Sequence, residues 1–132
     1  MYARDTVAQN LAMRVTEIAP GQAVVEMTLT DAMVNGHGIA HGGYVFLLAD
    51  TAFAYACNTH DAVTVAASAE VVFVAPAHAG DVLQATAVER TRFGRSGIYD
   101  VTVRRVPSGE VVAEFRGGSR SRAERVLDDT AP

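Results

Sequence analysis

The chain has 132 residues, a hydrophobic share of 49% and a formal net charge of −4, which together indicate one globular domain. The negative charge gives no support for nucleic-acid binding, and no apolar run reaches the roughly 18 residues that a membrane span needs. A single cysteine, Cys57, cannot form an internal disulfide, and the first residues lack the apolar core of a secretory signal, so we expect a cytoplasmic protein.

The first part of the chain predicts a short helix and a hairpin. Residues 5–11 form a candidate amphipathic helix with Val7 and Leu11 on its apolar side. Strands are expected over 13–18 and 23–29, joined by the turn sequence Ala-Pro-Gly-Gln. This hairpin precedes the main helix of the chain.

Residues 43–57 follow the spacing of a helix and carry one charged side chain, Asp50. The apolar residues that recur at intervals of three and four are Val45, Leu48, Ala49, Ala52, Phe53 and Ala56. The helical neighbours of Asp50 on either side are apolar, and no lysine or arginine is near it in sequence. A carboxylate in such a place costs free energy unless a function requires it, so Asp50 is a candidate catalytic residue.

The remainder of the chain predicts four strands. Residues 62–74 are valine-rich and almost continuously apolar, which indicates a strand covered on both faces and central in its sheet. Alternating patterns predict three further strands, over 82–92, 97–106 and 111–117. The order favours an α+β fold in which one antiparallel sheet wraps a single long helix.

The domain boundaries follow from the same pattern. We expect one domain over residues 1–120, and the polar, aperiodic residues 121–132 are predicted to form a flexible tail.

Gly42 and Gly43 begin the predicted helix, so their N–H groups lack intrahelical acceptors and form a site for an anion or a developing oxyanion. Asp50 lies seven residues after Gly43, about 10 Å along the helix axis. One helix therefore cannot easily bring its N-terminal amides and its own Asp50 to the same reacting carbon. If both act on one substrate, the carboxylate should come from another copy of the chain, which predicts an oligomer.

The run from Asn35 to Asn58, with His41-Gly42-Gly43 placed seven residues before Asp50, closely resembles the hot-dog fold thioesterases of the phenylacetate-pathway PaaI type. The resemblance implies hydrolysis of acyl-CoA thioesters by a homo-oligomer, with a dimer as the minimum, a tetramer as the full assembly and active sites at dimer interfaces. Coenzyme A is then part of the substrate, and no separate cofactor, metal, nucleic acid or membrane is expected as a partner.

The resemblance also implies roles for individual residues. Asp50 corresponds to the catalytic carboxylate, acting either as general base on water or as a nucleophile that forms an anhydride, and the Gly42 amide corresponds to the oxyanion donor. Asn35 and His41 would help to position the thioester or the water, and the turn 94–99 looks like the part that lies near coenzyme A. The other candidates for substrate contact are Gly43, Phe46, Thr51, Phe53, Arg92, Arg95 and Ser96.

Some residues, and the chain as a whole, also allow other interpretations. His37 and His41 are four residues apart, but the glycines between them argue against a helix that would align them on a metal, and no third ligand is evident. Cys57 has no activating base nearby and is interpreted as packing or pocket lining. A hydratase of the same fold, a non-catalytic acyl-CoA sensor and a thioesterase for aliphatic acyl groups are the alternative functions.

The acyl group is the least constrained feature. Phe46, Phe53 and Tyr55 with small alanines between them predict a flat slot suited to a ring, but the same aromatics could equally fill the core under the sheet. The resemblance favours phenylacetyl-CoA and its ring-hydroxylated relatives.

Overall fold

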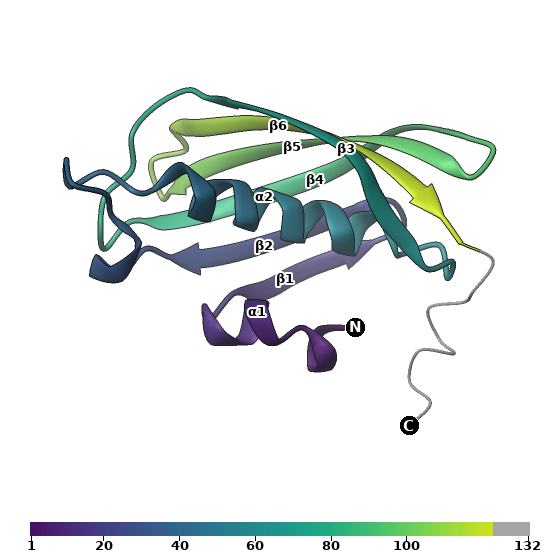
Figure 1. The fold of residues 1–132 in the computed structure, drawn as a ribbon, viewed down its shortest axis with the longest axis horizontal. Helices are drawn as coiled ribbons and strands as arrows, with labels where there is room; N and C mark the ends of the chain where they lie inside the picture. Colours follow the sequence, from purple (N-terminus) through teal and green to yellow (C-terminus); the bar gives the residue numbers. More distant parts are fainter. Residues whose placement is uncertain (123–132) are drawn as a thin grey trace.

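The computed structural model describes residues 1–122, which form one antiparallel sheet and one long helix (Figure 1). The strands are β1 (Arg14–Ala19), β2 (Gln22–Thr28), β3 (Thr64–Phe73), β4 (Val82–Phe93), β5 (Ser96–Val106) and β6 (Val111–Ser121). The helices are α1 (Thr6–Asn10) and α2 (Gly42–Cys57), with the 3₁₀ turns η1 (Tyr2–Arg4) and η2 (Asp31–Met33).

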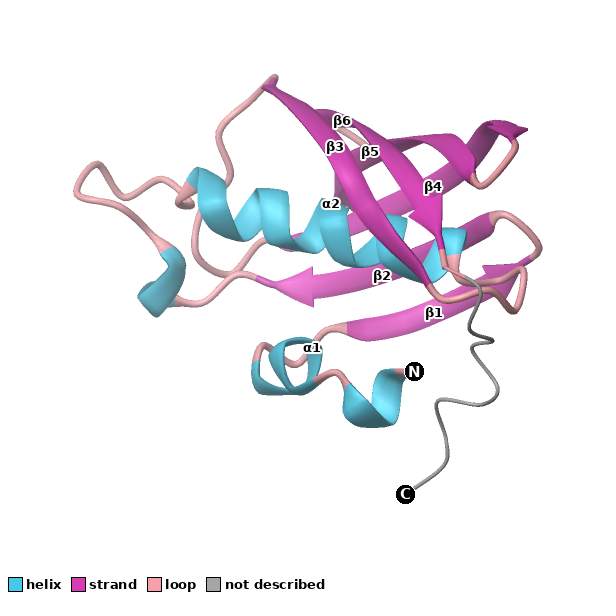
Figure 2. Ribbon diagram, turned by 45° about the vertical axis from the view of Figure 1, so that its right-hand side comes forward, coloured by secondary structure: helices cyan, strands magenta, loops and turns pink. Residues whose placement is uncertain are grey.

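The six strands run in the order β1-β2-β4-β5-β6-β3, and every neighbouring pair is antiparallel. The sheet curves around α2, as Figure 2 shows, and α2 contacts β2, β4 and β5 along its length. β1 and β3 are the two edges, and each has one side without a partner strand among the described residues. The chain thus encloses its helix from one side only.

The core lies between α2 and the concave face of the sheet. Leu48, Ala49, Ala52 and Ala56 on α2 have no exposed surface, and three of these four are alanines, which let the helix approach the sheet closely. The strands supply alternating buried side chains from β2, β4 and β5: Ala23, Val25, Met27, Leu83, Ala85, Ala87, Tyr99, Val101 and Val103.

Most predicted elements are confirmed. α2 begins at Gly42, the first of the two glycines predicted to start it, and ends at Cys57, with Asn58 as its C-cap. The predicted hairpin, the short N-terminal helix and the last three strands are present within a few residues of their expected bounds, and β6 continues to Ser121. Of the predicted tail, residues 123–132 lie outside the described part of the chain.

Two predictions were wrong. β3 is not central but lies at the edge beside β6, and Val65, Val72 and Phe73 on it are 43%, 56% and 54% exposed. The continuous apolar pattern is typical of a strand covered on both faces, but residues 1–122 leave much of the β3 surface exposed. On α1, Val7 is half exposed and Ala8 is the buried residue, because five residues make little more than one turn and present only one inward position.

A stability test follows from the contact between Gly117 on β6 and the ring of Phe53. A Cβ added to Gly117 would lie 2.8 Å from two ring atoms, and the ring is held by Tyr99 and Phe115 at centroid distances of 5.6 and 5.8 Å. Gly117→Ala should therefore destabilise the fold by about 1–3 kcal/mol, measured by urea unfolding at one protein concentration. Gly36→Ala is the control because its Cβ would meet nothing within 4 Å, and equal midpoints for the two variants would contradict the packing argument.

Candidate active site

The N-terminus of α2 is capped by a histidine ring. His41 is the N-cap residue in an extended conformation, and its Nδ1 accepts a hydrogen bond of 2.9 Å from the Gly43 N–H. The Gly42 N–H has no acceptor within residues 1–122. The sequence predicted that both glycine amides would be free. Of the two, only the Gly42 amide is free within the described residues, because the His41 imidazole accepts the hydrogen bond of the Gly43 amide. A neutral His41 that accepts at Nδ1 carries its proton on Nε2.

Asn35 shapes the loop that leads into the helix. Its Oδ1 accepts hydrogen bonds from the N–H groups of His37 at 2.8 Å and Ile39 at 3.2 Å, which closes a tight turn. Two backbone bonds then anchor the end of the loop: the N–H of Ala40 donates to the carbonyl of Ala77, and the N–H of His41 donates to that of Met33, both at 2.7 Å. Asn35 thus positions the backbone before Gly42, and its contact with a substrate stays a prediction.

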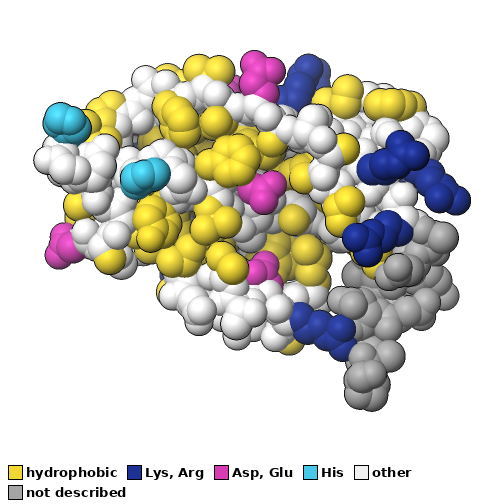
Figure 3. Space-filling model, viewed as in Figure 1, with side chains coloured by type: hydrophobic (Ala, Val, Ile, Leu, Met, Phe, Trp, Pro, Cys, Tyr) yellow, Lys and Arg dark blue, Asp and Glu magenta, His cyan; other side chains and the backbone are white. Residues whose placement is uncertain are grey.

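Asp50 lies on the side of α2 that the sheet does not cover. It is half-buried together with Phe46, Leu47 and Ala54, which lie three or four residues from it and form one stripe along the helix. Figure 3 shows acidic side chains among hydrophobic ones on one face of the molecule. Within residues 1–122 no hydrogen bond or ion pair reaches its carboxylate. Burial without a partner raises the pKa of Asp50 above its ordinary value of 3.8. A carboxylate that is both accessible and poorly stabilised is a good proton acceptor.

The remaining helical candidates face different surroundings. Phe46 is half-buried and packs edge-on against Phe115 at a centroid distance of 5.4 Å. Phe53 is 1% exposed within the core, and Thr51 is buried with its hydroxyl donating to the carbonyl of Leu47 at 2.7 Å. Substrate contact by these residues stays a prediction, and for Phe53 it would require the core to open.

Arg92, Arg95 and Ser96 do not come near Gly42 in one chain. They line a small polar recess with Cys57, at the other end of α2, and Gly42 and Cys57 are about 22 Å apart along the helix axis. Burial raises the pKa of Cys57 to about 12, so its thiol stays protonated and it is not an activated nucleophile. Coenzyme A could reach both ends only by spanning the helix or by using the arginines of a second copy.

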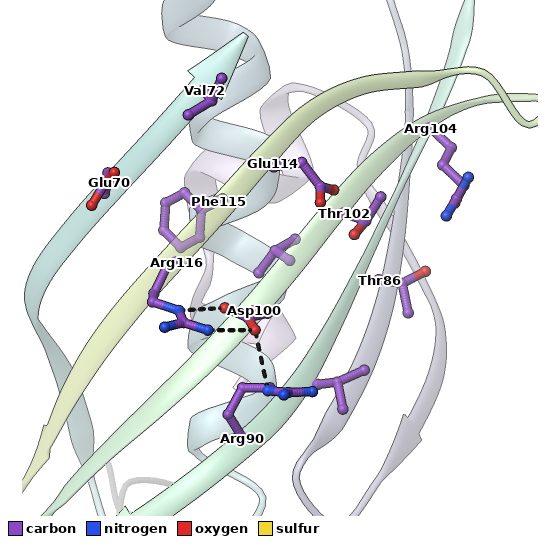
Figure 4. A pocket seen from close by; sticks show the side chains of 12 residues that line it. Glu70, Val72, Thr86, Arg90, Asp100, Thr102, Arg104, Glu114, Phe115 and Arg116 are labelled. Carbon is purple, nitrogen blue, oxygen red and sulfur yellow. Dashed lines mark hydrogen bonds and ion pairs between the residues drawn. The ribbon is translucent and has the colours of Figure 1, made fainter. Parts of the chain in front are cut away.

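A larger hollow of about 770 Å³ lies on the outer face of the sheet, away from α2 (Figure 4). Its central carboxylate is already neutralised, because Asp100 accepts hydrogen bonds from Arg116 Nε at 2.7 Å and Nη2 at 2.9 Å and pairs with Arg90 at 3.3 Å. Arg116 holds the pKa of Asp100 below its ordinary value. A carboxylate held this way is a weak base, so Asp100 is a poorer candidate for proton transfer than Asp50.

Sequence reasoning missed Phe73, whose ring lies against Gly42. A Cβ built on Gly42 would come within 2.9 Å of Phe73 Cζ. The contact joins the end of β3 to the start of α2, and no local pattern signals it, because only the register of β3 brings the two residues together.

Other classes of site are not supported by residues 1–122. No group of three histidine, cysteine, aspartate or glutamate side chains in this part of the chain is arranged to hold a metal ion. None of its helices combines the length and the apolar character required to span a membrane.

Comparison with known proteins shows the family of this chain. The family model of the thioesterase superfamily matches residues 37–112, which include Gly42, Gly43 and Asp50. The chain belongs to the thioesterase superfamily. The chain is 44% identical to the acyl-coenzyme A thioesterase PaaI of Escherichia coli K12 over 119 residues, which cover 90% of this chain and 84% of that protein.

Solved structures of this superfamily match the fold closely. The Escherichia coli PaaI protein from the phenylacetic acid degradation operon superposes with a TM-score of 0.92 at 42% identity, covering 95% of this chain and 90% of that one. A mutant of the phenylacetic acid degradation protein PaaI from Thermus thermophilus gives 0.84 at 37% identity, with 88% and 98% covered. The predicted hot-dog fold and the assignment as an enzyme are confirmed.

The unpaired carboxylate of Asp50 should lower the stability of the fold by an amount that depends on pH. Asp50→Asn should raise the melting temperature at pH 7, because the amide keeps the shape of the side chain without burying a charge. The folded-state pKa of Asp50 is raised, so the cost is fully present above that pKa and disappears as pH falls towards the ordinary value of 3.8. Thermal unfolding from pH 7 to pH 4 should show the two proteins converging, and an advantage for the variant that does not shrink on acidification would contradict the assignment.

Proposed function

We propose that this chain hydrolyses acyl-CoA thioesters, with aryl and arylacetyl groups such as phenylacetyl and hydroxyphenylacetyl as its substrates. The observation that carries the proposal is that α2 holds two unsatisfied groups, the free Gly42 N–H at its start and the desolvated carboxylate of Asp50 further along. The name of the Escherichia coli relative supports acyl-CoA as the substrate class, and the operon named for its structure supports the aromatic acyl group.

The chemistry follows from where charge develops. The thioester carbonyl oxygen accepts a hydrogen bond from the Gly42 N–H, and the positive end of the α2 dipole stabilises the oxyanion that forms there. Asp50 removes a proton from a water molecule as that water attacks the carbonyl carbon. The tetrahedral intermediate then collapses, the C–S bond breaks, and the thiolate of coenzyme A takes the proton from Asp50. Direct attack by Asp50 with an anhydride intermediate, later hydrolysed by water, uses the same groups.

The two groups are brought together by two copies of the chain. The half-exposed stripe of α2 and the unpaired edge of β3 both leave apolar surface open, and a second copy that pairs along β3 would cover them. In a twofold dimer each site takes Gly42 from one protomer and Asp50 from its partner. A dimer is then the smallest active unit and a tetramer the full assembly, in the cytoplasm.

Release of free coenzyme A is the decisive measurement. The protein should liberate thiol from phenylacetyl-CoA, and Asp50→Asn should lower kcat by about two to four orders of magnitude while substrate still binds. The kcat/KM profile should lose activity as pH falls through a pKa raised above 3.8, because the protonated carboxyl cannot accept a proton. Saturable binding without thiol release would instead identify an acyl-CoA sensor, and a preference for palmitoyl-CoA would identify an aliphatic thioesterase.

The shared site can be tested with hybrids of two inactive chains. Gly42→Pro deletes the amide hydrogen at a position whose backbone conformation suits proline, because Gly42 is the first helical residue and His41 before it has φ −61° and ψ 131°. The proline ring also requires Phe73 to move, because a Cβ at this position lies 2.9 Å from Phe73 Cζ. Co-expressed with Asp50→Asn, it should restore about a quarter of wild-type activity, since half of the randomly mixed dimers hold one intact site of two.

Gly42→Ala is the matched control for this experiment. It introduces the same Cβ against Phe73 but keeps the amide hydrogen, so it separates the loss of the donor from the steric effect. Hybrids no more active than either parent would contradict a site shared between protomers.

A further inference from the structure

Phe73 leaves half of its ring uncovered at the place where the proposed reaction occurs. The ring occupies the space that a side chain at position 42 would need, with Cζ at 2.9 Å and Cε1 at 3.2 Å from a Cβ built on Gly42. Phe73 is nevertheless 54% exposed. A ring that served only to cover the helix end would bury most of its apolar surface. The exposed part of the Phe73 ring is therefore available for contact with a ligand.

The ring forms one wall of an apolar pocket of about 450 Å³, a size typical of small-molecule sites. Gly42 lines the same pocket, and Val45, Pro76 and Val112 contribute other walls; none of its lining residues is charged. Backbone bonds fix these walls before any ligand enters. The N–H of Val74 donates to the carbonyl of Val112 at 2.8 Å.

Arg105 on β5 fixes the position of Pro76, which lines this pocket. Its Nη2 donates to the carbonyl of Pro76 at 2.7 Å, and its guanidinium pairs with Asp81 at 3.2 Å and Glu110 at 3.2 Å. The loop that follows β3 is therefore anchored to β5, and the pocket is preformed rather than assembled by the ligand.

We infer that Phe73 determines which acyl group the site accepts, by placing its ring against the acyl part of a thioester whose carbonyl oxygen binds the Gly42 N–H. This inference rests on the proposed function. Because Gly42 and Phe73 line the same pocket, an acyl group whose carbonyl binds the Gly42 N–H can lie against the Phe73 ring. A second ring gains an aromatic contact in that position, whereas a flexible chain gains only apolar burial and loses conformational entropy. The aromatic contact thus comes from β3 and not from the buried Phe53 of α2.

The test compares kcat/KM for phenylacetyl-CoA and hexanoyl-CoA in one set of conditions. Phe73→Leu keeps an apolar side chain but removes the ring, and it should lower the phenylacetyl-to-hexanoyl ratio by about three- to tenfold. Phe73→Tyr keeps the ring and should keep the ratio. Val72→Ala is the matched control, since Val72 is adjacent on β3 and lines the hollow on the opposite face of the sheet (Figure 4). Its ratio should stay within about twofold of the wild type.

Sedimentation of each variant accompanies the kinetics, because Phe73 lies on the strand proposed to pair between copies. An equal loss for both substrates, an unchanged ratio in Phe73→Leu, or a ratio lost in Phe73→Tyr would overturn the assignment of Phe73. A dimer that dissociates in Phe73→Leu with parallel losses would do the same and assign Phe73 to assembly. Those results leave the thioesterase function standing, whereas a wild-type protein that releases thiol from no acyl-CoA would overturn the function and the inference together.

Discussion

The structure depends on the packing of one apolar helix that the sheet can cover on only one side. α2 is built almost wholly of apolar residues, and its alanines let β2, β4 and β5 approach closely enough to exclude water from Leu48 and Ala52. A single curved sheet of this length cannot close around the helix, so the opposite stripe remains half-covered. That incomplete enclosure creates the electrostatic environment of the candidate site and leaves open the apolar surface on which the proposed dimer rests.

Asp50 differs from the other partly buried acidic residues within 1–122 in how its charge is balanced. Asp100 accepts two hydrogen bonds from Arg116, and Glu89 accepts a hydrogen bond from Tyr99 at 3.1 Å and pairs with His60 at 2.8 Å. Asp50 has neither kind of partner within residues 1–122. Stability would favour a neutral residue at this position, and a charged one is retained at a cost, as is usual where a charge serves catalysis.

The fold and the candidate pair of Gly42 and Asp50 were predictable because they follow from local patterns. The spacing of apolar residues around Asp50 defined α2 within one residue, and two consecutive glycines marked its start. What sequence could not supply was long-range geometry. It did not show that His41 would satisfy the Gly43 amide, which depends on a side-chain rotamer, or that Phe73 would reach Gly42, which depends on the register of β3. The prediction that β3 is central was wrong. An apolar strand pattern indicates that both faces need to be buried, but it does not indicate whether the same chain or another one buries them.

The open edge of β3 also bears on how the protein survives before it assembles. The strand carries a single charged residue, Glu70, and a bulge between Ala66 and Ser68 interrupts its ladder with β6. A newly made chain therefore has an exposed edge of unpaired backbone N–H and C=O groups with little charge, to which any extended segment can add as a strand. The bulge restricts the registers in which such a segment can pair. In the proposed dimer, assembly and protection from aggregation are the same event, so dilution would expose the chain to misassociation as well as to loss of its partner.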